Sequence, residues 1–418
     1  MNPTFAEATR TWAQIGCLSF GGPAGQIALM HRVIVDEKKW LSEKDYLSAL
    51  NFCMLLPGPE AMQLATYAGW KLHGIKGGLA AGLLFVLPGA VVVLLLSILY
   101  GEFGNLPWIA AIFYGVKAAV LAIVIEALLR VARRALKTNA DWIIAAIAFL
   151  ALFAFGLPFP LIIVAAAIFG FLRGGGKADI TMAVFPSYKS LGTTVIIWAA
   201  IWLAPLAALA VLLGPNHVLT EIGVFFSKLA VVTFGGAYAV LTYMAQAAVE
   251  EQGWLTAPEM IDGLALAETT PGPLILVTQF VGYLAASREL GGIWGGIAGA
   301  IVTLWMTFAP CFLWIFAGAP YIEHIGKRPR LAGALAAITA AVVGVILNLS
   351  IWFGLHVLFS KVARMGGWFQ PWIPEWSTLD WPSLALSILA AVLLLRLHLG
   401  IISILTICGG LGLLWKLL

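Results

Sequence analysis

The sequence has little charge. Of its 418 residues only 11% are charged, while 61% are hydrophobic, and the mean hydropathy is +0.97. A soluble domain carries roughly 25% charged residues. No segment is both long enough and polar enough to form a separate soluble domain. These absences predict an all-α polytopic membrane protein whose apolar runs cross a lipid bilayer.

Patterns that hold metals, cofactors or nucleophiles are also lacking. The four cysteines are scattered through apolar surroundings without CxxC spacing, and the six histidines include no pair four residues apart. No G-x-x-x-x-G-K-[ST] motif for ATP occurs. The sequence therefore predicts neither an enzyme nor a resident metal or cofactor. A net charge of +4 is too small to indicate a nucleic-acid partner.

What is present is a repeat. One constant shift pairs three separate motifs: Phe20-Gly21-Gly22 with Phe234-Gly235-Gly236, Trp40-Leu41 with Trp254-Leu255, and Pro57-Gly58-Pro59 with Pro271-Gly272-Pro273. Chance does not readily align tryptophan, glycine and proline over such a length. We expect a first transporter repeat at 1–175, a linker with one connecting helix at 176–218, and a second repeat at 219–418.

Apolar runs bounded by charged or turn residues predict about thirteen transmembrane helices. They are 11–30, 46–70, 77–100, 108–129, 142–155, 158–172, 191–213, 219–247, 259–286, 293–316, 331–359, 382–395 and 399–417. Six runs and one linker make the second repeat inverted relative to the first, which favours alternating access. Basic residues favour a cytoplasmic N-terminus, although the side of loop 32–44 stays open. No removable signal peptide is expected.

Two Pro-Gly-Pro clusters lie near the centres of their apolar runs. Proline has no amide proton and interrupts the helical hydrogen bonds, so Pro57, Gly58 and Pro59 should break one helix. The second cluster, at 271–273, should break another in the same way. The half-helix after a break begins with unpaired amides and the positive end of the helix dipole, which suits an anion. A structural kink is the alternative.

Two further clusters combine a hydroxyl with flexible backbone. Their members are Ser19, Phe20, Gly21 and Gly22 in the first half, and Thr233, Phe234, Gly235 and Gly236 in the second. They could complete one anion-binding site at the interface between the repeats. Glycines in membrane helices also serve close helix packing, which is the alternative.

Polar side chains inside apolar runs are candidates for function. Lys117 and Lys228 could neutralise a dianion, although each could instead extend to the membrane surface. Glu60 and Glu268 flank the breaks and could bind coupling protons. The other candidate substrate contacts are Gln63, Gln279, Thr269 and Thr270. An amide of glutamine can donate to an oxyanion or equally to a neighbouring helix.

The order of these motifs resembles the two-domain form of the chromate ion transporter family. The resemblance rests on Phe-Gly-Gly-Pro at 20–23, Trp-Leu at 40–41, Leu-Pro-Gly-Pro-Glu at 56–60 and Thr-Thr-Pro-Gly-Pro at 269–273, and it covers nearly the whole chain. The second copy departs from the first at Leu274, where the first has Glu60.

This resemblance implies efflux of chromate, a dianion similar to sulfate, across the inner membrane with a proton or ion gradient, and thereby chromate resistance. Chromate itself comes only from the resemblance. From the residues alone, a carrier or exchanger of sulfate or another oxyanion, and less so an anion channel, stay open. Small-residue faces could pack within one chain or between two, so a homodimer also stays open.

Overall fold

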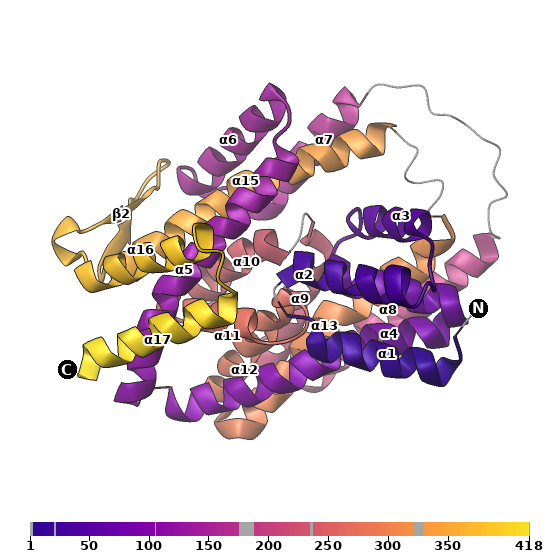
Figure 1. Cartoon of the computed structure of the whole chain (residues 1–418), viewed down its shortest axis with the longest axis horizontal. Helices are drawn as coiled ribbons and strands as arrows, with labels where there is room; N and C mark the ends of the chain where they lie inside the picture. The colour runs from indigo at the N-terminus through magenta and orange to yellow at the C-terminus, as the bar shows by residue number, and fades with distance from the viewer. Residues whose placement is uncertain are drawn as a thin grey trace. The chain divides into compact units, whose positions relative to one another are not determined.

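The protein is almost entirely helical (Figure 1). The computed structural model describes residues 3–20, 22–104, 106–174, 188–234, 237–321 and 329–417. Within these ranges the only sheet is one two-stranded hairpin. The prediction of an all-α membrane protein is confirmed at this level.

The chain divides into two compact units, and each is discontinuous in sequence. Unit 1 comprises Met1–Ile98, Gly174–Val240 and Thr270–Ala332, and unit 2 comprises Leu99–Arg173, Leu241–Thr269 and Gly333–Leu418. Each unit therefore takes segments from both predicted repeats. The repeat boundaries at 175 and 219 stay a prediction, because the units divide the chain in a different way.

Unit 1 is built mainly from short helices in the first half and their counterparts in the second. Its elements are α1 (Phe5–Leu18), α2 (Gly22–His31), η1 (Arg32–Glu37), α3 (Glu43–Cys53), most of α4 (Glu60–Phe103), α8 (Tyr188–Leu212), α9 (Val218–Val232), the start of α10 (Ala237–Gln246), η3 (Leu274–Leu276), α12 (Val277–Leu290), α13 (Gly292–Gly318) and η4 (Ala319–Tyr321). Hydroxyl caps begin two of them: Thr4 accepts from the Glu7 amide and Ser42 from the Asp45 amide.

A tight helical hairpin occurs twice in unit 1. In α4 the helix is interrupted at His73 and Gly74, the latter with φ 62°. A Cβ atom on Gly69 would lie 2.3 Å from Gly77 O, so only glycine permits this approach. Helices α12 and α13 turn at Gly291, which has φ 77°, and a Cβ on Gly299 would lie 2.2 Å from Gly282 O. Small residues thus bring both hairpins together.

Unit 2 is organised around α5 (Figure 1), which packs against α11, α16 and α17. Its elements are the end of α4, α5 (Pro107–Ala135), α6 (Asn139–Phe153), α7 (Phe159–Arg173), the rest of α10, η2 (Ala247–Glu251), α11 (Ala257–Thr269), most of α15 (Pro329–Leu358), β1 (Val362–Arg364), β2 (Trp372–Pro374), η5 (Trp376–Thr378), α16 (Trp381–Leu395) and α17 (Ile401–Leu417). Strands β1 and β2 are antiparallel, with Arg364 opposite Trp372.

Five helices among the described residues are long and apolar enough to cross a membrane. They are Glu60–Phe103, Pro107–Ala135, Leu191–Leu212, Gly292–Gly318 and Pro329–Leu358. Shorter apolar helices are Asn139–Phe153, Phe159–Arg173, Trp381–Leu395 and Ile401–Leu417. These lengths fit a protein that crosses the bilayer several times. The number of about thirteen spans stays a prediction.

The prediction of continuous helices over 11–30 and 219–247 is wrong. The first run is divided into α1 and α2 after Leu18, and the second into α9 and α10 after Val232. The reason is local: Ser19 and Thr233 leave the helical region, with ψ values of 70° and 78°. The predicted interruptions of 46–70 and 259–286 at the Pro-Gly-Pro clusters are confirmed.

Candidate functional site

The first Pro-Gly-Pro break lies between α3 and α4. Helix α3 ends at Cys53 and α4 begins at Glu60, directly after Pro59. Gly58 has φ 118°, a conformation that favours glycine. A Cβ at Gly58 would lie 2.8 Å from Gln63 Nε2 and 2.9 Å from Cys311 Sγ. The break is therefore tightly enclosed by its own following helix and by α13.

The second break lies between α11 and α12. Pro271, Gly272 and Pro273 are buried, and Gly272 has φ 89°. The chain continues through the short 3₁₀ helix η3 before α12. A Cβ atom on Gly89 of α4 would lie 2.0 Å from Pro271 O, so α4 approaches this break at backbone distance. Each break therefore packs against a hairpin helix from the opposite half of the chain.

A reciprocal pair of backbone hydrogen bonds joins the two halves within unit 1. The Gly58 amide donates to Thr233 O at 2.8 Å, and the Gly272 amide donates to Ser19 O at 2.9 Å. These are equivalent groups under the sequence shift that pairs the motifs. The predicted meeting of the Pro-Gly-Pro clusters with Ser19 and Thr233 is therefore present in the structure. In this conformation both glycine amides are engaged by protein and not available to a ligand.

The two hydroxyls at these junctions are turned back onto their own helices. Ser19 Oγ donates to Ile15 O at 2.6 Å and Thr233 Oγ1 donates to Leu229 O at 2.5 Å. Both side chains are buried. Phe20 and Phe234 follow them, each with its amide bonded to the residue two positions earlier. Of the neighbouring glycines, Gly22 begins α2, whereas Gly21, Gly235 and Gly236 lie outside the described residues.

Glutamine side chains support the breaks. Gln63 donates from Nε2 to Pro57 O at 2.7 Å, within the first break. Gln26, which the sequence analysis did not single out, donates from Nε2 to Gly272 O at 2.6 Å, in the second. Their Oε1 atoms and that of Gln279 are buried and have no hydrogen-bond partner among the described residues. The sequence signal that could have identified Gln26 is its polar side chain within an otherwise apolar helix.

The carboxyl candidates differ in placement. Glu60 is the first residue of α4, in unit 1, where its carboxyl lies at the positive end of the helix. Glu268 is buried near the end of α11, in unit 2. Thr269 donates its hydroxyl to Leu266 O at 2.7 Å, and Thr270 is buried. Among the described residues no group of three His, Cys, Asp or Glu could hold a metal ion.

The two lysine candidates have different surroundings. Lys228 is exposed on α9 of unit 1. Lys117, on α5 of unit 2, instead forms an ion pair: its Nζ lies 3.2 Å from Oδ2 of Asp262 on α11. Tyr100 donates its hydroxyl to the same oxygen at 2.8 Å. Asp262 was not among the sequence candidates, although a carboxylate inside an apolar segment is such a signal.

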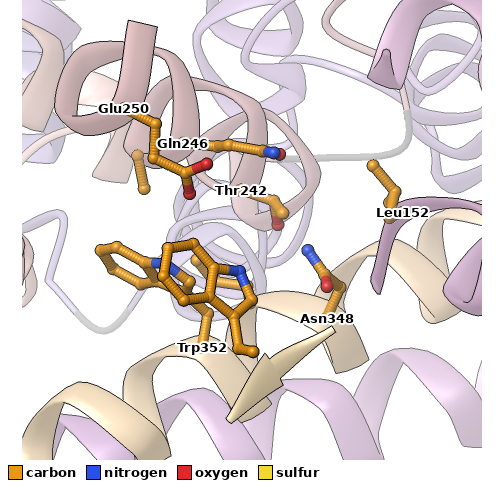
Figure 2. Close-up of a pocket in the computed structure, with 9 residues that line it drawn as sticks. Leu152, Thr242, Gln246, Glu250, Asn348 and Trp352 are labelled. Carbon is orange, nitrogen blue, oxygen red and sulfur yellow. The ribbon is translucent and has the colours of Figure 1, made fainter. Parts of the chain in front are cut away.

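A small polar cavity lies within unit 2 (Figure 2). Thr242, Gln246 and Glu250 line it from the α10 and η2 side, and Asn348 and Trp352 line it from α15. Glu250 is held by Arg364, whose Nη1 lies 2.8 Å from Glu250 Oε2. The cavity is about the size of one water molecule. Its size and its carboxylate make it a poor site for an oxyanion.

Comparisons with known proteins give sequence matches over most of the chain. The sequence model of one family, described as Chromate transporter, matches residues 6–171 and 220–413. A probable chromate transport protein of Synechococcus elongatus is 30% identical over 369 residues, covering 87% of this chain and 89% of that protein. The chromate transport protein of Cupriavidus metallidurans is 30% identical over 358 residues, covering 82% and 81%.

A third relative, the chromate transport protein of Pseudomonas aeruginosa, is 33% identical over 351 residues, covering 82% of this chain and 79% of its own. No solved structure matches the chain. The family match covers both halves and begins and ends close to the ends of the described helices. This chain therefore belongs to the chromate transporter family.

Proposed function

We propose that this protein is a secondary transporter that exports chromate, a sulfate-like oxyanion, from the cytoplasm and so confers chromate resistance. The observation that carries the proposal is the reciprocal pair of hydrogen bonds, Gly58 to Thr233 and Gly272 to Ser19. Equivalent parts of two halves meet there, at two helix breaks inside an apolar protein. The names of three relatives supply the substrate.

The physical basis is the start of a helix at each of the two breaks. The first amides of a helix have no acceptor within it, and they carry the positive end of the dipole. Helix α4 starts at Glu60, and α12 starts at Val277 after the 3₁₀ turn η3, so each break leads into such a helix start. An oxyanion bound there would be held by backbone rather than by a fixed cation, which allows release as well as binding. Lys228, in the same unit as the breaks, is the proposed source of positive charge there, and Lys117 is a proposed substrate contact within unit 2.

Alternating access follows from the repeat. In the proposed topology the two halves are inverted and together contribute about thirteen spans, with the N-terminus in the cytoplasm and the protein in the inner membrane. Exchange of the conformations of two similar halves then moves access from one face to the other. The glycines at the breaks, Gly58 with φ 118° and Gly272 with φ 89°, permit backbone geometry that other residues adopt rarely.

The deciding experiment measures uptake of radiolabelled chromate into everted membrane vesicles, with the proton-motive force, that is the pH gradient and the membrane potential together, imposed and then collapsed. Export predicts uptake that exceeds that of vesicles lacking the protein and falls when the proton-motive force collapses. Unlabelled sulfate distinguishes the substrate: inhibition much weaker than that by the same concentration of unlabelled chromate supports chromate, whereas equal inhibition supports a general oxyanion carrier. Absence of uptake above the control would refute the proposal. Accumulation no greater than the electrochemical equilibrium value would instead indicate a channel.

A further inference from the structure

The ion pair between Lys117 and Asp262 is buried within unit 2. Side-chain exposure is 23% for Lys117 and 5% for Asp262. The pair joins α5 to α11, which pack against each other. Tyr100, near the end of α4, donates to the same Asp262 oxygen that receives Lys117. Two donors therefore converge on Oδ2.

The other oxygen of Asp262 has a different environment. Oδ1 is buried and has no hydrogen-bond partner among the described residues. An ionised carboxylate accepts hydrogen bonds at both oxygens, and a buried acceptor without a donor costs about 1–3 kcal/mol. A protonated carboxyl carries its own donor. This geometry therefore leaves one oxygen paired and the other suited to receive a proton.

The charged groups around Asp262 come from the packed elements. Lys117 faces it from α5, and Glu259, one turn earlier on α11, adds negative charge. Helix α17 also packs against α11, and its Lys416 lies over the Tyr114 ring at 4.5 Å. An unpaired charge inside a membrane protein is costly, so the carboxylate and the ammonium hold each other in place. While that pair persists, the Lys117 ammonium is bound to Asp262 and is not available to an anion.

We propose that Asp262 and Lys117 form a proton-gated charge pair, in which a proton on Asp262 releases the Lys117 ammonium to bind the transported oxyanion. This inference rests on the proposed function and deepens it. The ion pair, one proton and one dianion become a neutral carboxylic acid and an ammonium paired with the dianion. One O–H bond forms, no other covalent bond changes, and the total charge is the same before and after.

Binding of the two ligands is then coupled. Each ligand favours the state that binds the other, so proton and oxyanion bind with positive cooperativity and move together. One proton and one dianion carry a single net negative charge, so the membrane potential, negative inside the cell, drives their export. Asp262 lies on α11, whose last residue, Thr269, directly precedes the second break. The loss of the ion pair thus occurs on the helix that leads into that break. This supplies a role for Lys117 that differs from a fixed positive charge in the substrate site.

The test measures chromate binding to purified protein by calorimetry between pH 7 and 9, where chromate is mainly the dianion, in two buffers with different ionisation enthalpies. The wild-type protein should take up one proton per chromate, and its affinity should fall by up to about tenfold per pH unit as pH rises. Asp262→Asn should bind chromate with no proton uptake and little pH dependence. Lys117→Gln should lose at least about tenfold in affinity.

Three matched variants keep the test decisive. Tyr100→Phe removes a donor to the ionised carboxylate, so the pH at which affinity falls should move upward while proton uptake persists. Glu250→Gln disrupts a second, partly buried ion pair of unit 2, with Arg364, and should leave proton uptake unchanged. The double variant Asp262→Asn with Lys117→Gln is uncharged and should not regain wild-type affinity.

The outcomes separate the two proposals. Unchanged proton uptake in Asp262→Asn, an unmoved pH profile in Tyr100→Phe, or wild-type affinity in the double variant would overturn the charge pair as a coupling element and make it structural. A wild-type protein that binds neither chromate nor sulfate at any pH would instead refute the proposed function. Size-exclusion profiles of each variant report whether the protein is folded.

Discussion

The two helix breaks share a backbone plan and differ in chemistry. At the first break α4 begins with Glu60, whereas the equivalent position at the second is the buried Leu274. Gly58 is enclosed by the side-chain ends of Gln63 and Cys311, while the second break is enclosed by the backbone at Gly89. Yet each glycine amide makes the same hydrogen bond to the opposite half.

This difference indicates which break suits an anion better. A carboxylate at a helix start interacts with the positive end of the dipole and would compete with a bound oxyanion. Leu274 brings no such charge. We therefore expect the second break to be the main oxyanion contact, and the first to depend on the protonation of Glu60. The two breaks are thus alike in their backbone structure, and they differ in the side-chain charge that a bound anion would meet.

The largest effect is expected from Gly89→Ala, which acts on the second break alone. The new Cβ would lie 2.0 Å from Pro271 O, a backbone atom that cannot move independently of the break. Displacement by about 1 Å can reduce a rate by about 100-fold, so chromate uptake into everted vesicles should be nearly abolished while membrane insertion persists. Gly410→Ala is the control, because a Cβ there meets nothing within 4 Å. Equal uptake by both variants would disprove the close contact between Gly89 and the carbonyl of Pro271.

Exchange of charge between the breaks should have the next largest effect. Leu274→Glu places a carboxylate at the second helix start, and it should weaken chromate binding by about tenfold or more below saturation, since such a charge contributes up to about 2 kcal/mol. Leu274→Gln is the size-matched control. Glu60→Gln should make uptake less dependent on the pH gradient. If Leu274→Glu and Leu274→Gln bind chromate equally, the second break is not the main contact.

The supporting glutamines allow a smaller test of the same comparison. Gln26→Leu leaves Gly272 O without its side-chain donor, and Gln63→Leu does the same to Pro57 O. Each loss should lower the free energy of unfolding by about 1–3 kcal/mol. Because Gln26 joins the two halves and Gln63 acts within one break, transport should fall more in Gln26→Leu. Thermal unfolding and uptake are measured on the same preparations. A larger fall in transport in Gln63→Leu than in Gln26→Leu would contradict the role of Gln26 in joining the two halves.

The smallest effect concerns the π-helical corners that follow α2 and α10. His31 lies 2.6 Å from Glu43 and 3.3 Å from Asp36, and the hydrogen bond that the imidazole donates to the Glu43 carboxylate, with help from Asp36, raises the pKa of His31. Its stabilisation is therefore complete below the unfolded pKa of about 6.5 and is lost as pH rises through the higher folded value. Limited proteolysis at η1 should be faster at pH 8 than at pH 6, after correction for the protease's own pH dependence.

The corner at η2 provides the internal comparison. Its ion pair joins Glu250 to Arg364 and includes no histidine, so cleavage there should change little over this pH range. His31→Gln should remove the pH dependence at η1. If the dependence at η1 survives this substitution, another group is responsible for it.

Much of the scaffold could be predicted from sequence. The interruptions at Pro57 and Pro271 follow from the missing amide proton of proline, and the family match follows from motifs that recur in one register. The breaks after Leu18 and Val232 could not be predicted, because glycine next to a hydroxyl is also compatible with a continuous packed helix. The bonds between Gly58 and Thr233 and between Gly272 and Ser19 depend on tertiary contacts between distant segments.

Side-chain partners were harder to infer than backbone breaks. Lys117 could be recognised as a charge inside an apolar run, but its partner Asp262 is distant in sequence and belongs to another helix. The role of Gln26 likewise depends on a residue far along the chain. A hydrophobic pattern reports which residues lie in the membrane, but it does not report which polar groups meet there.

The crossed hydrogen bonds also constrain biosynthesis. Gln26 and Gly272 are 246 residues apart, so the first half must enter the membrane long before the groups that complete its junctions have been synthesised. Until then the carbonyl of Ser19 and the amide of Gly58, which both lie in predicted transmembrane runs, lack their final partners. The first half is thus an incomplete folding intermediate for as long as translation of the second half takes, and that interval is when membrane quality control would meet it.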